Sequence, residues 1–353
     1  MTNDSLGMLE ALEAMPEQLA SAATASRVVL DIARLPDHDD ISNIVLCGVG
    51  TAGHACSFVL EAVGPTIPVP IVVHRGYGLP NFVDDSTLVV AVSLGGDTAE
   101  TVDAVQLAID DGAAVACVTS GGELARVVVD AGGLVLPVVA DVPNERAAFA
   151  ALTAPAMLLL ERIGFDPGAT AWIDDAIEHL ARRRDVLVGE RSPSRGLARA
   201  LGRSFPLIYG GNGPGGMLAA LWKSAFNEGA KVAAFHNVVP ALTHDEIAGW
   251  GQDGDVTRQV FQTIFLRHDF EHPSVAQRLD VVEELMVEVV GDVHVVVAEG
   301  DGLLSQMYDM ALFGLLTSVY AAFAQDVDPG PVPIIDEIDS RVGERAGPTL
   351  PAG

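Results

Sequence analysis

The segment Leu88-Val89-Val90-Ala91-Val92-Ser93-Leu94-Gly95-Gly96-Asp97-Thr98-Ala99-Glu100-Thr101 joins a short apolar run to a turn rich in glycine and hydroxyl groups. Consecutive aliphatic residues, several of them β-branched, are typical of a strand buried in a parallel sheet. The turn ends in residues that suit the start of a helix. This segment therefore predicts one strand–turn–helix unit of an α/β fold.

The same pattern recurs along the whole chain. Apolar runs that alternate with helical stretches occupy residues 44–47, 69–73, 114–118 and 134–139, and then 206–209, 232–235, 262–266 and 293–297. Such alternation predicts two doubly wound parallel sheets with helices on both faces and ligand loops at the strand carboxyl ends. We expect N-terminal helices in residues 1–36, a first domain in 37–184, and a second domain with a C-terminal tail in 185–353.

Composition limits the class of protein. Of 353 residues 49% are hydrophobic, and 48 acidic against 20 basic residues give a net charge of −28. A surface this acidic repels nucleic acid and anionic membranes, so neither is expected as a partner. The start of the chain lacks the basic and apolar regions of a secretory signal, and no apolar run reaches the roughly 18 residues of a membrane helix. Cys47 and Cys117 lie in apolar runs and are expected to be buried, and we expect a cytoplasmic protein.

Two glycine-rich turns are candidate ligand loops. The first, Gly48–Gly53, places Gly50, Thr51 and Gly53 where backbone amides can approach a phosphate or a sugar. His74-Arg75 ends the second run where a dinucleotide site needs an acidic residue, which argues against NAD, and no cofactor is expected. The alternative is a purely structural turn.

The second turn carries hydroxyl groups at the start of a helix. Ser93, Thr98 and Thr101 surround Gly95-Gly96 and suit a phosphate. The alternative is a plain helix cap by Thr98.

A carboxylate and an imidazole form the candidate catalytic pair. Glu228, in Asn227-Glu228, follows a predicted helix, and His244 follows 16 residues later among polar residues. A base and an imidazole are the groups needed to move a proton between adjacent sugar carbons and to open the ring. The alternative for such a pair is ordinary solvated surface. The remaining histidines have no metal-ligand spacing, so no metal site is expected.

Taken in order, these segments resemble the bifunctional phosphoglucose/phosphomannose isomerase family, whose members contain two sugar isomerase (SIS) domains. The resemblance covers roughly residues 40–341. It rests on the two glycine turns, on 75–80, on Arg146-Ala147-Ala148-Phe149, on Asn227-Glu228 with Lys231, on Pro240 and His244, and on 333–338.

This resemblance implies flavodoxin-like SIS domains and a homodimer with the active site at the subunit interface. It also implies metal-free isomerisation of glucose 6-phosphate and mannose 6-phosphate with fructose 6-phosphate. Residue by residue, Glu228 matches the base that works through a cis-enediol. His244 matches a histidine supplied by the partner subunit, Arg146 an arginine facing the enediolate, and Ser93 and Thr98 phosphate-binding hydroxyls.

The chain also departs from the family pattern. Ala52 and Gly95 stand where the family has serines, and Asp97 replaces an asparagine. Asp339 stands where the family has a lysine that helps to open the sugar ring. Arg341, two residues later, is a candidate to take over the role of that lysine. An inward-facing Asp97 would repel phosphate. Three hypotheses therefore remain. The protein is a working isomerase, an impaired SIS protein that binds a sugar derivative as a sensor or interaction partner, or a purely structural dimeric partner.

Overall fold

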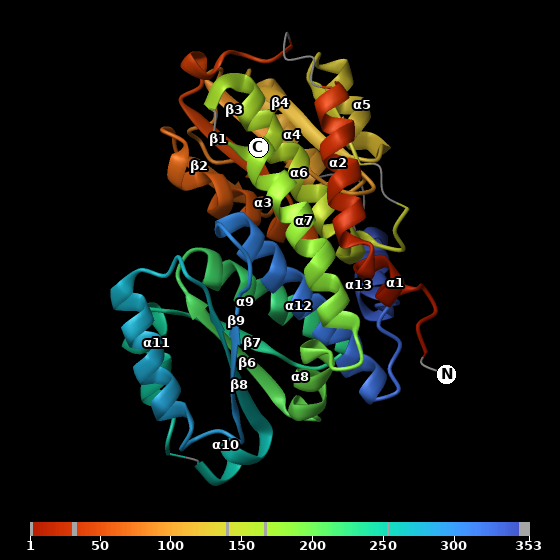
Figure 1. The fold of residues 1–353 in the computed structure, drawn as a ribbon. Coiled ribbons are helices and arrows are strands. Elements are labelled where there is room, and N and C mark those ends of the chain that lie inside the picture. The colour runs from red at the N-terminus through yellow and green to blue at the C-terminus, as the bar shows by residue number, and fades with distance from the viewer. Residues whose placement is uncertain (1–2, 30–33, 139–140, 166–167, 253, 346–353) are drawn as a thin grey trace.

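The computed structural model describes residues 3–29, 34–138, 141–165, 168–252 and 254–345. Two parallel sheets, one in each half of the chain, form its framework, and Figure 1 shows them as the upper and lower halves of the molecule. The predicted α/β fold class is confirmed.

The first sheet has five strands in the order β2-β1-β3-β4-β5, which is the flavodoxin-like order. Side chains that alternate along the central strands face two separate apolar clusters. One cluster includes α2 (Met15–Val29), α3 (Gly50–Val63) and α6 (Phe149–Leu160), and the other includes α4 (Ala99–Asp110) and α5 (Gly122–Asp130), so helices cover both faces. The strands are β1 (Asn43–Cys47), β2 (Ile71–His74), β3 (Thr87–Val92), β4 (Ala114–Thr119) and β5 (Leu134–Pro137).

The helices of this half begin with the two predicted leading helices, α1 (Met8–Glu13) and α2 (Met15–Val29). They continue with α3 (Gly50–Val63), α4 (Ala99–Asp110), α5 (Gly122–Asp130), the short turn η4 (Glu145–Ala148), α6 (Phe149–Leu160) and α7 (Ala169–Val188). Of the predicted run 134–139, Val139 lies outside the described residues.

The second sheet has four strands in the order β7-β6-β8-β9, which repeats the first four positions of the other sheet. Its strands are β6 (Phe205–Gly211), β7 (Phe235–Val239), β8 (Phe261–Arg267) and β9 (Val293–Val297). Its helices are α8 (Pro193–Leu201), α9 (Pro214–Ala225), the π-helical turn η6 (Phe226–Ala230), η7 (Ala241–His244), α10 (Gly254–Val260), α11 (Pro273–Met286), α12 (Leu303–Ala324) and α13 (Pro333–Arg345).

One prediction about this sheet was wrong. The apolar run 232–235 was expected to be a strand, but β7 begins only at Phe235. Lys231 adopts a left-handed conformation with φ 56° at the end of η6. Residues 232–234 connect this turn to the strand, so they do not pair in the sheet. The hydropathy of the run could not reveal this local geometry.

Long apolar helices join the two halves. α12 packs against α7, α8 and α9, while α3 packs against α9, so a single apolar cluster extends across both sheets. The segments Glu145–Phe165 and Leu303–Ala324 are long and apolar enough to cross a membrane by length and composition. Most of each is buried inside the protein, as in the core helices of a globular fold.

The division at residues 36/37 and 184/185 stays a prediction, because α7 crosses the second boundary and the core continues through it. The cysteine prediction is confirmed, since Cys47, Cys117 and also Cys56 are buried thiols. Burial raises the pKa of Cys47 and Cys117 to about 12, so both remain protonated.

Candidate functional site

The two predicted ligand loops meet at the point where the strand order of the first sheet reverses. β1 lies between β2 and β3, and the loops after β1 and β3 leave the sheet at its carboxyl edge. A Cβ added to Gly48 would lie 3.1 Å from the carbonyl oxygen of Val92, so the loops are in contact. Ligands of doubly wound sheets bind in the crevice at this switch point.

The hydroxyl loop is ordered by its own side chains. Ser93 is buried, and its Oγ lies 3.0 Å from Oγ1 of Thr98 and accepts a hydrogen bond from the amide of Gly96 at 3.2 Å. Thr98 occupies the N-cap position of α4, but its side chain caps no amide of that helix. Thr98 therefore does not act as a plain helix cap, which was the alternative. The first-turn amides of α4 are left without a side-chain cap, as an anion site requires.

Asp97 stands where the family has an asparagine, and the structure shows which way its carboxylate points. Oδ1 of Asp97 accepts a hydrogen bond from the amide of Glu123 at 2.9 Å, in the first turn of α5. The carboxylate therefore interacts with the positive end of a different helix. Because it is held there, Asp97 does not point into the loop it belongs to, and the expected repulsion of phosphate is relieved.

Four other predicted binding residues lie in helices near these loops. Gly50 has φ 57° at the start of α3, which favours glycine, and Thr51 is buried beside it. Gly53 has a packing role, because a Cβ there would come within 2.7 Å of the carbonyl oxygen of Gly48. Thr101 is buried in α4, and its hydroxyl has no hydrogen-bond partner among the described residues.

The candidate base comes from the other half of the chain. Glu228 lies in η6, a π-helical turn that follows α9, and such turns are frequent at functional sites. Its Oε2 is 3.4 Å from Nε of Arg146, which is buried in η4. Burial raises the pKa of Glu228, while Arg146, Lys231 and Lys223 act in the opposite direction. The structure thus brings Glu228 and Arg146 together.

Arg146 also holds a loop of the C-terminal region. Its Nη1 donates to the carbonyl oxygen of Pro329 at 3.0 Å, and Nη2 donates to the carbonyl of Gly330. Three of the five N–H donors of the guanidinium therefore face protein groups. The cation remains beside Glu228, so it can stabilise negative charge there, but a substrate has fewer of its donors to bind.

Sequence reasoning missed Glu145, the neighbour of Arg146. Its Oε1 accepts a hydrogen bond from the amide of Leu94, in the hydroxyl loop, at 3.1 Å. Burial raises the pKa of Glu145, and the charge of Glu228 adds to this rise. Glu145 and Arg146 thus connect the hydroxyl loop to Glu228. The only signal in the sequence was its position next to a predicted site residue.

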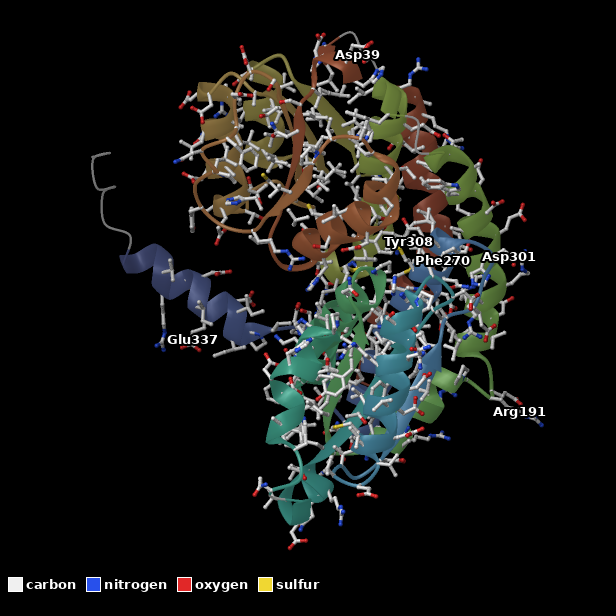
Figure 2. All side chains as sticks on the ribbon, turned by 90° about the vertical axis from the view of Figure 1, so that its left-hand side faces the viewer. Asp39, Arg191, Phe270, Asp301, Tyr308 and Glu337 are labelled. Carbon is white, nitrogen blue, oxygen red and sulfur yellow. The ribbon has the colours of Figure 1, made fainter. Side chains whose placement is uncertain are left out.

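The structure does not bring His244 to Glu228. His244 is exposed in η7, after β7, and no hydrogen bond or ion pair joins the two residues within the described part of the chain. Arg341, the suggested substitute for the family lysine, forms an ion pair with Glu337 on α13. Figure 2 shows Glu337 on this helix, which projects away from the two halves.

A buried histidine lies where α3 meets α9. Nε2 of His54 is 2.9 Å from Oγ of Ser224, and its Nδ1 has no partner among the described residues. Burial, and then the charges of Arg75, His236 and Lys223, lower the pKa of His54 to about 4. The imidazole is therefore neutral at pH 7.

This histidine should make folding sensitive to acid. Folding lowers the pKa of His54 from 6.5 to about 4. At pH values above 6.5 its contribution to the stability of the folded state is fully present, and this contribution is lost as the pH falls toward 4. We expect wild type to lose up to about 3 kcal/mol more than His54→Gln between these pH values. Urea unfolding of both proteins at several pH values measures the difference, and parallel pH profiles would contradict the assignment.

The serine missing at Gly95 can be restored. A Cβ at Gly95 would meet nothing within 4 Å and its φ is not positive, so Gly95→Ser fits without strain. A new hydroxyl donor to a charged phosphate contributes about 1.5 kcal/mol or more, so sugar-phosphate binding should tighten by about tenfold. Calorimetry with fructose 6-phosphate tests this, with Gly95→Ala as the control for the added methyl group. Equal affinities of the serine and alanine variants would count against a phosphate at this loop.

The chain is similar to known proteins over most of its length. Residues 190–342 match the family model described as the bacterial phospho-glucose isomerase C-terminal SIS domain. The chain is 28% identical over 341 residues to the bifunctional phosphoglucose/phosphomannose isomerase of Caldicellulosiruptor bescii, covering 96% of this chain and 99% of that protein. The Thermoplasma acidophilum protein of the same name is 28% identical over 307 residues, covering 85% and 90%.

The chain is thus similar over most of its length to bifunctional phosphoglucose/phosphomannose isomerases, and its C-terminal part matches a SIS-domain family model. Its fold also resembles tagatose-6-phosphate ketose/aldose isomerase from Escherichia coli, with a TM-score of 0.73, 13% identity, and coverage of 93% of this chain and 96% of that one. At that identity the likeness shows a shared SIS-domain fold. The resemblance of the sequence to this family is therefore confirmed.

Proposed function

We propose that the protein is a sugar-phosphate aldose–ketose isomerase that interconverts fructose 6-phosphate with glucose 6-phosphate or mannose 6-phosphate. The observation that carries this proposal is the position of Glu228. This carboxylate, with a pKa raised by burial, lies 3.4 Å from a buried arginine and is linked through Glu145 to a hydroxyl loop suited to phosphate. The names of its relatives support the same reaction class.

In the proposed reaction Glu228 moves one proton between neighbouring carbons. The carboxylate removes the C2 proton of the open-chain aldose, and the C–H electron pair forms the C1=C2 bond of a cis-enediol while O1 takes up a proton. The same carboxyl group returns its proton to C1 as O2 loses one and becomes the ketone oxygen. A base with a raised pKa suits both steps, and the Arg146 cation stabilises the negative charge that develops.

We assign the phosphate to the hydroxyl loop. Ser93 and Thr98 supply hydroxyl groups, and the amides of Gly50 and Thr51 supply backbone donors at the same crevice, while the amide of Gly96, also predicted to line this site, holds the Ser93 hydroxyl in place. These neutral donors suit an anion in a chain of net charge −28, where a free basic patch is scarce. The fixed position of Asp97 against α5 supports this assignment.

We further propose that the working unit is a cytoplasmic homodimer in which the partner copy supplies His244. The exposed position of this histidine, with no hydrogen bond or ion pair to Glu228 in the described chain, supports a role in another subunit. α13 also presents the exposed apolar side chains Ile334, Ile335, Ile338 and Val342, which a second copy would cover. Light scattering at micromolar concentration should report a dimer.

A coupled assay tests the function. Purified protein is mixed with fructose 6-phosphate, and glucose 6-phosphate and mannose 6-phosphate are measured over time, while calorimetry measures binding of the same sugar phosphate. Turnover above the protein-free rate supports the isomerase. Saturable binding with a rate at background would instead support the impaired, sugar-sensing protein, for which the losses at Ala52, Gly95 and Asp339 are the sequence argument.

A further inference from the structure

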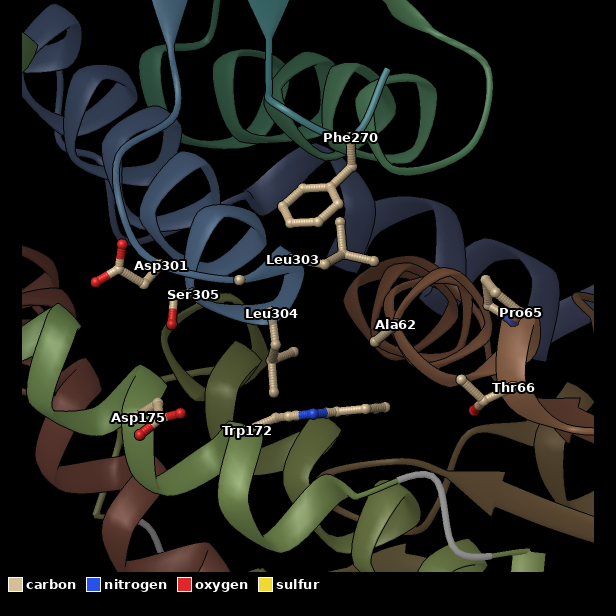
Figure 3. Close-up of a pocket in the computed structure, with 11 residues that line it drawn as sticks. Ala62, Pro65, Thr66, Trp172, Asp175, Phe270, Asp301, Leu303, Leu304 and Ser305 are labelled. Carbon is tan, nitrogen blue, oxygen red and sulfur yellow. The ribbon is translucent and has the colours of Figure 1, made fainter. Parts of the chain in front are cut away.

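A second cavity lies between the two halves of the chain, at the opposite end of α3 from the candidate site. Its volume is about 300 Å³, and it is drawn in Figure 3. α3 starts at the Gly50 turn and ends at Val63, so at 1.5 Å per residue it separates the two places by roughly 20 Å. The lining residues come from the end of α3 and the following turn (Ala62, Pro65, Thr66), from α7 (Trp172, Asp175), and from Phe270 and the start of α12 (Asp301–Ser305).

Most of the cavity wall is apolar. Figure 3 shows the indole of Trp172 beneath Leu304 and Ala62, with Leu303 and Phe270 above them. A concave, mostly apolar pocket between two domains, with a few polar groups on one side, is the usual form of a small-molecule site. The volume is at the lower end of the range for such sites, so it suits a compact ligand.

The charged groups of this cavity favour a cation. Asp175, Asp301 and Ser305 lie together on one side of the cavity in Figure 3, away from Pro65 and Thr66. Among the residues that the structure describes, no lysine, arginine or histidine lines it. Both carboxylates are exposed, and within the described residues neither forms an ion pair. Ser305 is a buried residue, and its hydroxyl makes no hydrogen bond to the described residues.

We propose that this cavity binds a small organic cation, an ammonium or guanidinium group attached to an apolar or aromatic body. The body would lie among Trp172, Leu303 and Leu304, and the charged group would face Asp175, Asp301 and Ser305. An indole face adds attraction for a cation. A sugar phosphate does not fit this chemistry, since the two carboxylates repel its charge, so the site is distinct from the one at the hydroxyl loop.

Binding at this position should stabilise the folded protein. The walls come from α3 and α7 in the first half and from α12 in the second, so a ligand would contact both halves at once. A ligand that binds only the folded state raises the melting temperature in proportion to the logarithm of its concentration over its dissociation constant. This readout does not depend on isomerase activity.

The test uses phenethylamine as the cationic probe, with 2-phenylethanol and phenylacetate as neutral and anionic probes of similar shape. Calorimetry and thermal unfolding are measured for wild type and for the double variant Asp175→Asn, Asp301→Asn. Asp174→Asn is the matched control, because Asp174 neighbours the cavity residue but pairs with Arg27 at 2.8 Å. A third variant, Trp172→Leu, removes the aromatic wall.

We expect phenethylamine to bind saturably to wild type and to Asp174→Asn. Its affinity should be lower by about tenfold or more for the double variant, and it should also be lower for Trp172→Leu. The alcohol should bind more weakly than the amine, and phenylacetate more weakly still. Three outcomes would each overturn the proposal. They are equal affinity of the amine and the alcohol for wild type, unchanged affinity of the amine for the double variant, and no binding of the amine by wild type up to about 10 mM, the weak end for a ligand of this size. Unfolding profiles without ligand show whether each variant is folded.

Discussion

Glu228→Gln is expected to reduce isomerase turnover by about 10²–10⁴-fold, the usual contribution of a general base. Glutamine keeps the size of the side chain and a hydrogen-bond acceptor toward Arg146, but it cannot take up a proton from carbon. Binding of fructose 6-phosphate should change far less, because the phosphate is assigned to the hydroxyl loop. The measurement is kcat and sugar-phosphate affinity for both proteins, side by side.

The matched control is Glu61→Gln. Burial also raises the pKa of Glu61, which lies in α3, so the substitution removes a similar carboxylate away from Glu228 and Arg146. Its turnover should stay close to that of wild type. A Glu228→Gln protein as active as wild type would remove Glu228 from the role of base.

The pH profile provides an independent test of the same residue. A base must be deprotonated to act, so kcat/KM should fall as pH falls through the pKa of Glu228. Burial raises this pKa, so the acid limb should lie above the range of an ordinary glutamate. In Glu228→Gln, any remaining activity should lack this limb.

The fold could be predicted from the sequence because its signal is local. Apolar runs that end in glycine turns identified the strand positions, with β7 the exception, and the repetition of this pattern indicated two sheets. The start of β7 depends on the left-handed turn at Lys231, and nothing in the hydropathy of residues 232–235 records it. Errors of this kind arise where backbone geometry overrides the apolar pattern.

The candidate site could be predicted only in part, because its contacts join distant segments. Ser93 and Thr98 are five residues apart, and their pairing follows from one short loop. A family resemblance suggested separate roles for Arg146 and Glu228 but not the ion pair between them. The hydrogen bond from the Leu94 amide to Glu145, and those from Arg146 to the carbonyl oxygens of Pro329 and Gly330, had no signal in the sequence. The direction of Asp97 likewise depends on α5, which packs beside the loop only in the folded chain.

Gly96→Ala should disrupt the hydroxyl loop and lower the stability of the protein. Gly96 has φ 79°, and a Cβ there would lie 1.9 Å from the carbonyl oxygen of Gly121, which is backbone and cannot turn aside. The strained conformation alone costs about 1 kcal/mol or more, and relief of the clash requires the two loops to separate. We expect a loss of at least about 2 kcal/mol in the free energy of unfolding, measured by urea denaturation.

The same substitution should also remove most sugar-phosphate binding, because the backbone of Gly96 holds the loop together. Its amide donates to Ser93, and its carbonyl accepts from the amide of Leu124 at 2.8 Å, so a shift at this residue displaces both the buried hydroxyl and the start of α5. The neighbouring variant Gly95→Ala is the matched control: its Cβ would meet no atom within 4 Å, and its stability should stay within about 0.5 kcal/mol of wild type. If Gly96→Ala binds fructose 6-phosphate as tightly as Gly95→Ala does, the phosphate lies elsewhere, and the assignment of the hydroxyl loop is wrong. If only Gly96→Ala loses binding while remaining folded, the backbone around Gly96 is part of the anion site, since the control differs by the same methyl group at the next position.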